Sequence, residues 1–399
     1  MPFYRIVFSS LVVLIALLPV QSFAKEVVKM GAGSGLPFSP AVKAGNFVYV
    51  SGALATNEKG QVVPGTIQEQ TKQVLNHLGT VLKASGSRLE NAASVNVYLR
   101  NAADFEAMNE AYRGFWSKDP PTRTTVVTDL VLPEALVEIA MVAIKDGVER
   151  RVVHPASWNK SPNYSYGIQS GDTLFLAGLV ARNMKDNSSV AGDIGLQTQT
   201  VLSNAGEILK AAGMTHADVA SSRVFITDAA KFQDMNTAYR PFFSKDPPAR
   251  ATVKAALMNP SYQVEITLLA VKSSDREAIN PPGADGKPAQ PSPNYSSGIR
   301  VGNRLYVAGM VGSTPGNKGD MKAQTRESLN NIGRTIKAAG FDWSQVVESI
   351  VYVTDTRQFP TMNAAYRETF TKDFPARTTV GIEIVIPDPL VEIMLTAVK

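Results

Sequence analysis

A six-residue pattern occurs three times in this chain at a constant spacing of 127 residues. The pattern is Met-Asn-x-Ala-Tyr-Arg, and its copies begin at Met108, Met235 and Met362. The same spacing separates three arginines in a Pro-x-Arg-x-Thr context and three glutamates in a Val-Glu-Ile context. A repeat of this length far exceeds the roughly 20–50 residues of a solenoid or propeller unit, so each copy is long enough to enclose its own core. The sequence therefore predicts three tandem domains of one fold.

The first 24 residues differ from the repeats and are typical of an export signal. Arg5 precedes an apolar run at 6–20, and small residues stand at Ser22 and Ala24, the positions that a signal peptidase reads. We predict cleavage after Ala24 and a periplasmic or secreted location. An uncleaved membrane anchor is the alternative, which the short apolar run and Pro19 disfavour. The expected organisation is a signal peptide at 1–24 and domains at 25–150, 151–280 and 281–399.

Composition excludes several classes of chemistry. The chain has 44% hydrophobic and 19% charged residues, which is a globular composition, and its net charge of +5 is too small to indicate nucleic-acid binding. It has no cysteine, and its three histidines, His77, His154 and His216, do not share a repeat position. We therefore expect no disulfide, no metal site and no cofactor, and no histidine chemistry common to the three repeats.

Each repeat shows the same series of secondary-structure signals. A short β-rich run ends in glycine, at 46–52, 173–178 and 304–309, and an amphipathic helix follows at 70–84, 197–211 and 324–338. A strand, a second helix with the Met-Asn pattern and two final strands complete the order β-β-α-β-α-β-β. Two helices on one face of a mixed sheet make an α+β sandwich. The segments 146–160 and 273–292 read as surface linkers, since the second is rich in Pro and Gly.

Taken together, these motifs resemble the Rid family (RidA/YjgF), the reactive-intermediate deaminases formerly called L-PSP endoribonucleases. The resemblance rests on the Ser-Pro-Asn-Tyr segments, the Met-Asn-x-Ala-Tyr helix, the arginine strand and the Val-Glu-Ile strand, and it covers residues 31–399 three times. Single-domain members of this family have a chorismate-mutase-like fold and form trimers with pockets between neighbouring subunits. The resemblance implies that this chain folds as a covalent pseudo-trimer.

The arginines Arg123, Arg250 and Arg377 are the first candidate site residues. Each begins a strand after a Pro-rich turn, where we expect its side chain at the mouth of a cleft. A guanidinium matches a carboxylate at two points, so it suits an acid derived from an amino acid. Pairing with a neighbouring acid, or a place in the interface between repeats, is the alternative. The family resemblance implies that this Arg holds the substrate carboxylate.

The glutamates Glu138, Glu265 and Glu392 are the candidate catalytic groups. Each stands among alternating apolar residues, so it either faces solvent or is a partly buried acid beside a pocket, and strand alternation favours the solvent face. The resemblance implies that this Glu orients a water molecule near the substrate. A partly desolvated carboxylate can then take a proton from that water as general base.

Further candidates follow from the resemblance, with ordinary packing, turn formation or helix capping as the alternatives. Pocket-lining aromatics are implied at Tyr164 and Tyr295, with Phe38 as their counterpart in the first repeat. The missing hydroxyl of Phe38 is expected to weaken the site of that repeat, that of Arg123. The remaining candidates are the strand-end glycines Gly52, Gly178 and Gly309 and the helical asparagines Asn109, Asn236 and Asn363, which fit a position reaching toward the pocket of a neighbouring domain. The chain departs from the family archetype at Thr125, Thr252 and Thr379, where a Cys is common.

The function implied by the resemblance is hydrolysis. An exported hydrolase would release ammonium from 2-imino or enamino acids and leave 2-oxo acids, as a 2-iminobutanoate/2-iminopropanoate deaminase does. A non-catalytic small-carboxylate binding module of the same fold is the alternative. A ribonuclease, suggested only by the older family name, is disfavoured because the repeats share no His and no basic aromatic surface. We expect a small carboxylate-bearing substrate, no nucleic acid, no membrane association after cleavage, and a monomeric pseudo-trimer.

Overall fold

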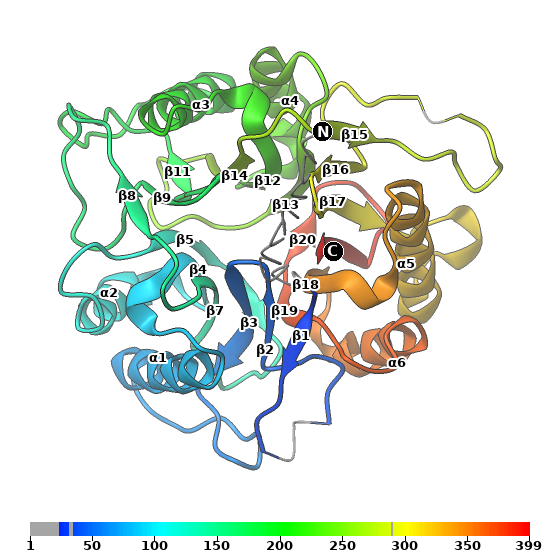
Figure 1. The fold of residues 1–399 in the computed structure, drawn as a ribbon, viewed down its shortest axis with the longest axis horizontal. Coiled ribbons are helices and arrows are strands. Elements are labelled where there is room, and N and C mark those ends of the chain that lie inside the picture. The colour runs from blue at the N-terminus through cyan, green and yellow to red at the C-terminus, as the bar shows by residue number, and fades with distance from the viewer. Residues whose placement is uncertain (1–23, 32–34, 289) are drawn as a thin grey trace, which may run out of the picture.

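The computed structural model describes residues 24–31, 35–288 and 290–399, and the predicted signal peptide lies almost wholly outside them. Three similar units surround a common centre, with strands inside and helices outside (Figure 1). Repeat 1 contains β1 (Glu26–Val28), β2 (Ala41–Ala44), β3 (Phe47–Leu54), α1 (Ile67–Ala84), β4 (Ala92–Leu99), α2 (Phe105–Arg113), β5 (Thr122–Val127), β6 (Asp129–Leu130) and β7 (Val137–Ile144). Repeat 2 contains β8 (Arg151–Val153), β9 (Gly167–Ser170), β10 (Thr173–Leu176), β11 (Leu179–Val180), α3 (Ile194–Ala211), β12 (Val219–Ile226), α4 (Phe232–Tyr239), β13 (Ala249–Lys254) and β14 (Val264–Val271). Repeat 3 contains β15 (Arg276–Ile279), β16 (Gly298–Val301), β17 (Arg304–Val311), α5 (Met321–Ala338), β18 (Val346–Val353), α6 (Phe359–Thr369), β19 (Ala376–Gly381), β20 (Glu383–Ile384) and β21 (Val391–Val398).

The predicted β-β-α-β-α-β-β order is confirmed in every repeat. The first sheet runs β1-β2-β3-β7-β4-β5, in which β4 and β5 are parallel and the other neighbours are antiparallel. Each of the two presumed linkers also supplies a strand, β8 and β15, at an outer edge of its sheet. An edge strand pairs on one side only, so a short strand fits before the Pro-rich part of the second linker begins.

Local sequence fixes the long helix of each repeat. The side chains of Thr66, Asp193 and Asp320 accept the N–H of the residue three positions later, which caps α1, α3 and α5. The helices then end before the glycines at 86, 213 and 340, which have positive φ of 73°, 70° and 74°. Glycine adopts this conformation without the Cβ penalty, so the predicted stop signals are confirmed.

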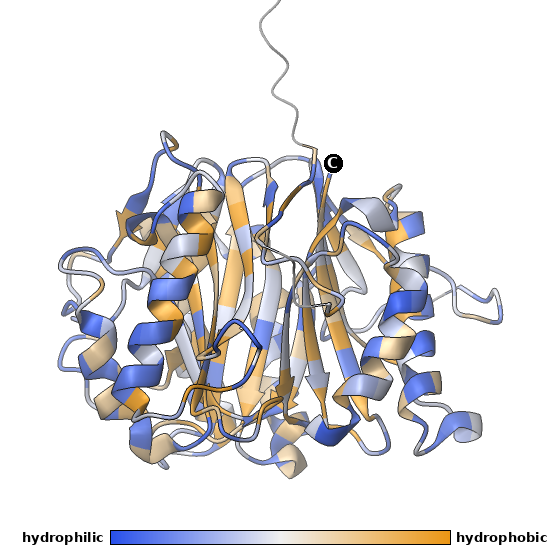
Figure 2. Cartoon of the chain, turned by 90° about the horizontal axis from the view of Figure 1, so that it is seen from below, coloured by the Kyte–Doolittle hydropathy of each residue, from blue (hydrophilic) through white to orange (hydrophobic). Residues whose placement is uncertain are grey.

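The two faces of each sheet have different partners. The face toward the helices packs a separate apolar core in each repeat, and the inner face packs against the inner faces of the other two repeats. Tyr98, Phe225 and Tyr352, one from each repeat, belong to a single shared cluster. Figure 2 shows apolar residues along the central strands and hydrophilic ones on the outer side of the helices. An inner face that is apolar and shared requires the three units to associate.

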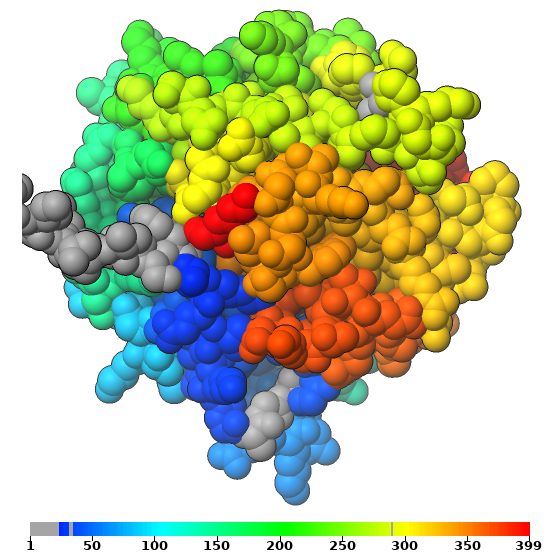
Figure 3. Space-filling view, turned by 45° about the vertical axis from the view of Figure 1, so that its right-hand side comes forward, coloured from blue at the N-terminus to red at the C-terminus, as the bar shows by residue number. Residues whose placement is uncertain are grey.

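Strand pairing also joins the repeats in a cycle. β6 of repeat 1 pairs with β19 of repeat 3, β20 of repeat 3 pairs with β13 of repeat 2, and Val127 forms a bridge with Ala256. The segment after each arginine strand therefore extends the sheet of a neighbouring repeat. These contacts confirm the predicted pseudo-trimer, whose close packing is visible in Figure 3.

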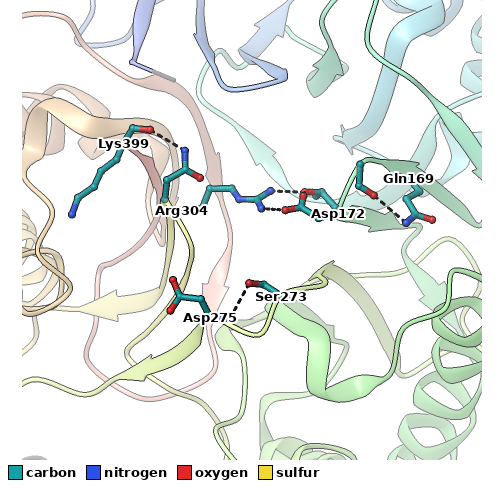
Figure 4. A network of polar contacts seen from close by, with 9 residues as sticks. Gln169, Asp172, Ser273, Asp275, Arg304 and Lys399 are labelled. Carbon is teal, nitrogen blue, oxygen red and sulfur yellow. Dashed lines mark hydrogen bonds and ion pairs between the residues drawn. The ribbon is translucent and has the colours of Figure 1, made fainter. Parts of the chain in front are cut away.

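Ionic contacts strengthen the junction of repeats 2 and 3. Arg304 on β17 points toward the turn between β9 and β10, where it forms an ion pair with Asp172 and donates to the hydroxyl of Thr173 (Figure 4). Arg304 is partly buried, with 13% of its side chain exposed, so solvent screens this pair less than an open surface pair.

We expect one chain to form the complete particle. The linkers hold the three repeats at a high effective concentration, so closure within a chain should prevail over exchange between chains. Light scattering should give the mass of a single chain across a wide concentration range. A stable three-chain particle would show that the repeats of one chain do not satisfy one another.

Candidate active sites

Each candidate site lies between two repeats and takes its Arg from one and its Glu from the other. At the junction of repeats 1 and 2, the N–H of Thr125 donates to Glu265 Oε1 over 3.4 Å, two residues after Arg123. The N–H of Gly178 donates to the carbonyl oxygen of Arg123 over 3.0 Å. The strand that carries Arg123, β5 of repeat 1, thus lies beside Gly178 of repeat 2.

The same arrangement recurs at the other two junctions. The guanidinium of Arg250 interacts with the charge of Glu392, and that of Arg377 with the charge of Glu138. We name the sites by their residues. Site A contains Arg123, Glu265, Tyr164 and Gly178; site B contains Arg250, Glu392, Tyr295 and Gly309; site C contains Arg377, Glu138, Phe38 and Gly52.

The three arginines are buried, which corrects the expected position at a cleft mouth. Only 6%, 4% and 3% of Arg123, Arg250 and Arg377 are exposed. Each guanidinium lies over the Tyr of the Met-Asn-x-Ala-Tyr helix in its own repeat, with the Arg Cζ 4.7 to 4.8 Å from the ring centroid. The neighbouring repeat covers the start of the arginine strand, so an edge position that is open within one repeat is closed in the assembly.

The three glutamates are also buried, so of the two expected positions the structure shows the buried acid and not the solvent face that strand alternation favours. Glu138, Glu265 and Glu392 are only 3%, 6% and 5% exposed. In β7 the side chains of Val137 and Ile139 enter the helix-side core, so alternation directs Glu138 to the inner face. Strand alternation therefore gives the correct face, the one opposite the helices, but the adjacent repeat covers that face.

The glycines make room for the glutamates of their own repeats. A Cβ on Gly52, Gly178 or Gly309 would lie 2.0, 2.0 or 1.9 Å from the Oε1 atom of Glu138, Glu265 or Glu392. In repeats 1 and 3 the strand pairing shifts register across this glycine, and in repeat 2 the strand is interrupted there. Bulges of this kind are common beside active sites, because they re-aim nearby groups. The backbone at each glycine therefore lies close to the carboxyl group of the candidate Glu.

Burial shifts the pKa of both the Glu and the Arg of each site in the direction that favours the neutral form. It raises the pKa of Glu138 to about 8, of Glu265 to about 7 and of Glu392 to about 8, although backbone N–H groups and nearby arginines oppose the shift. It lowers the pKa of Arg377 to about 10 and also lowers those of Arg123 and Arg250. A carboxyl group with a pKa near neutrality can both accept and return a proton.

Buried polar atoms without partners recur at equivalent positions of the three sites. Within the described residues, no hydrogen-bond partner is found for the Nη1 atom of the three arginines or for the Oγ1 atom of Thr125, Thr252 and Thr379. No arginine nitrogen of these sites comes within 4.0 Å of a carboxylate oxygen in the described part of the chain. Unpaired buried polar groups are costly, so these three equivalent sets of atoms are available to bind a small polar ligand or water.

The aromatic candidates face the Arg of the preceding repeat, which corrects one assignment. Tyr164 and Tyr295 interact electrostatically with Arg123 and Arg250, and Arg377 Cζ lies 5.5 Å from the ring centroid of Phe38. The missing hydroxyl therefore affects site C and not the site of Arg123. The closure of the chain places the start of repeat 1 against repeat 3.

Two further sets of residues support the sites. The asparagines Asn109, Asn236 and Asn363 are all buried. Asn236 accepts a 2.7 Å hydrogen bond from Arg250 of its own repeat, so it contacts the Arg of that repeat. The glutamines Gln70, Gln197 and Gln324 accept the N–H located two residues before each candidate Glu. The sequence analysis did not predict these glutamines as site residues, nor the tyrosines under the guanidinium groups, Tyr112, Tyr239 and Tyr366. The signal that could have found them is that each position holds the same residue type in all three repeats.

Replacing Glu138 by Gln is expected to stabilise the protein at alkaline pH. A raised folded-state pKa gives a contribution that is fully present below about pH 4.5 and is lost as the pH rises through about 8. Glutamine removes this loss, so the free energy of unfolding at pH 8.5 should increase by about 2–4 kcal/mol, with little change at pH 5. Denaturant unfolding at both pH values measures the difference. An equal effect at both would mean that ionisation of Glu138 is not the cause.

Comparison with known proteins gives a family match over most of the chain. The family model described as Endoribonuclease L-PSP matches three times, over residues 33–145, 156–272 and 287–399. These ranges correspond to the three structural repeats and contain every Arg and Glu of sites A, B and C.

Individual relatives match over about the length of one repeat. A RutC family protein from Pyrococcus horikoshii is 37% identical over 111 residues, which cover 28% of this chain and 88% of that protein. The 3-aminoacrylate deaminase RutC from Acinetobacter baylyi is 40% identical over 108 residues, or 27% of this chain and 86% of that protein. A 2-iminobutanoate/2-iminopropanoate deaminase from Dermatophagoides farinae is 33% identical over 109 residues, or 27% of this chain and 85% of that protein.

Proposed function

Because the chain belongs to the Endoribonuclease L-PSP family, also called the Rid family, we propose that sites A, B and C hydrolyse 2-imino acids to 2-oxo acids and ammonium. The observation that carries the proposal is the threefold recurrence of a buried Arg with a free Nη1 atom beside a buried Glu whose pKa is near neutrality. The relatives named as deaminases support this assignment.

We assign a role to each group. The Arg binds the substrate carboxylate, with its guanidinium held over the ring of the Tyr of its own repeat. The Glu from the neighbouring repeat takes a proton as a water oxygen bonds to the imine carbon, and it then gives that proton to the nitrogen. Breaking the carbon–nitrogen bond, with transfer of the remaining hydroxyl proton to the nitrogen, releases the 2-oxo acid and ammonia, which takes up a proton from the solvent and becomes ammonium.

Within the described residues, no group of three His, Cys, Asp or Glu side chains has an arrangement that could hold a metal ion. The Arg anchor that the three sites share favours substrates with a carboxylate beside the imine carbon.

The direct test follows ammonium release from an imine made in situ by an amino-acid oxidase. The protein should accelerate formation of the 2-oxo acid above the spontaneous rate, with semicarbazide trapping to report the imine that remains. A parallel calorimetric titration with 2-oxopropanoate reports binding. Binding without any acceleration would establish the carboxylate-binding module and overturn the hydrolase.

We also propose that the enzyme acts outside the cytoplasm, in the periplasm or the medium. The support is the signal-like sequence at 1–24, which lies almost wholly outside the described residues. The part of the chain that the structure describes has no helix long and apolar enough to cross a bilayer. Mass spectrometry of the exported protein should find Lys25 at its N-terminus. An intact Met1 chain in the membrane fraction would contradict this proposal.

A further inference from the structure

Site A differs from the other two sites by a second arginine. Arg182 follows Gly178 by four residues, and the equivalent positions after Gly52 and Gly309 are Thr56 and Ser313. The strand register supports this equivalence, because Val180 lies opposite Glu265 as Leu54 lies opposite Glu138. Only repeat 2 therefore adds a cation at this point of the strand.

Strand geometry places Arg182 on the side of the catalytic carboxyl group. Arg182 is two residues beyond Val180, which ends β11 and pairs with Glu265, and the backbone of Arg182 forms a further β-bridge with Ser189. In such an extended segment, side chains two residues apart share a face. A diagonal neighbour of this kind is within reach of a long side chain. Arg182 also interacts electrostatically with Tyr164 and Glu265, the two side chains that repeat 2 supplies to site A.

The guanidinium of Arg182 is held in place by its own support. Its Nε donates to the hydroxyl of Tyr262 over 2.6 Å, its Nη1 donates to Asn187 over 2.9 Å, and its Cζ lies 5.3 Å from the ring centroid of Tyr262. Within the described residues, no hydrogen bond uses its Nη2 atom. Tyr262 is itself buried, and its equivalents are Ala135 and Pro389, so the support also occurs only in repeat 2.

We propose that site A accepts an imino acid with a second carboxylate group, which Arg182 binds while Arg123 binds the first. The imine of a short dicarboxylic amino acid has this chemistry, since its carboxylates are separated by a few bonds and its imine carbon lies between them. Sites B and C, with Ser313 and Thr56, lack the second anchor and favour monocarboxylic imines. The assignment rests on the proposed hydrolysis for its reaction, although the recognition of a second carboxylate stands independently of it.

The test uses chains with a single functional site. Glu138→Gln with Glu392→Gln leaves site A, and Glu138→Gln with Glu265→Gln leaves site B. For each chain, kcat/KM is measured with the imines of aspartate and of alanine. The ratio of kcat/KM for the aspartate imine to kcat/KM for the alanine imine should be higher for the site A chain than for the site B chain. Adding Arg182→Thr to that chain should lower the ratio by about 10- to 100-fold, chiefly through KM, since a charge-assisted contact is lost.

A second variant and a binding measurement keep the outcome clear. Tyr262→Phe preserves the ring and removes the hydroxyl that holds Nε, so it should lower the ratio by a smaller factor in the same direction. Calorimetry with 2-oxobutanedioate and 2-oxopropanoate should show the same preference, even if no imine is hydrolysed. If Arg182→Thr changes both substrates equally, or only shifts the pH profile, Arg182 merely balances the charge of Glu265 and the proposal is wrong.

Discussion

Replacing Glu138, Glu265 and Glu392 together by Gln should lower the rate of imine hydrolysis by about 10²–10⁴-fold, the usual range for loss of a general acid or base. Gln keeps the shape of each side chain and a carbonyl oxygen that can accept the N–H of Thr125, Thr252 or Thr379. It cannot accept the proton of the attacking water. Steady-state release of ammonium at pH 8, where a substantial fraction of each Glu is ionised in the parent, measures the loss.

The triple variant should nevertheless remain folded and bind product. Each of these carboxyl groups is 3% to 6% exposed and is destabilised when ionised, so its replacement by a neutral isostere favours the folded state. The arginine anchors are unchanged, so calorimetry should still detect a small 2-oxo acid. A folded triple variant with the parent rate would exclude these glutamates as the proton-transfer groups.

Sequence alone predicted the repeat and the order of its elements, because these depend on local signals. The 127-residue spacing identifies the Arg and Glu positions, and the glycines at 86, 213 and 340 end the long helices as expected. The Pro-rich linker hid β15, because an edge strand of four residues gives almost no periodic signal.

The environment of the site was not predictable from one repeat. Strand alternation assigns Glu138 to the face opposite the helices, but only the assembled trimer shows that repeat 3 covers that face. Phe38 was assigned to the site of Arg123 because the two lie in one repeat, whereas closure of the ring places it beside Arg377. Burial of Arg377 also restricts which replacement suits a test of its role. Truncation to Ala would remove the group that packs on Tyr366 and Phe359, so a polar residue of similar length is the better replacement.

The assembly of each site from two repeats predicts an outcome that a site within one repeat cannot produce. A chain with Arg123→Gln, Arg377→Gln and Glu138→Gln has lost the anchor of site A and both groups of site C, but it retains Arg250 and Glu392 of site B. Since distant sites act independently, about one third of the parent activity should remain. Ammonium release per chain measures this fraction.

Adding one further substitution to that chain distinguishes an Arg–Glu pair drawn from two repeats from an Arg–Glu pair within one repeat. Glu265→Gln falls in site A, which is already disabled, and should leave the remaining activity nearly unchanged. Glu392→Gln removes the base of the surviving site and should lower the activity by a further factor of about 10² or more. The two chains have the same number and kind of substitutions and differ only in which Glu is replaced. If Arg250 instead worked with Glu265 of its own repeat, the first addition would abolish activity and the second would be harmless, so the comparison decides whether the catalytic pair crosses the boundary between repeats.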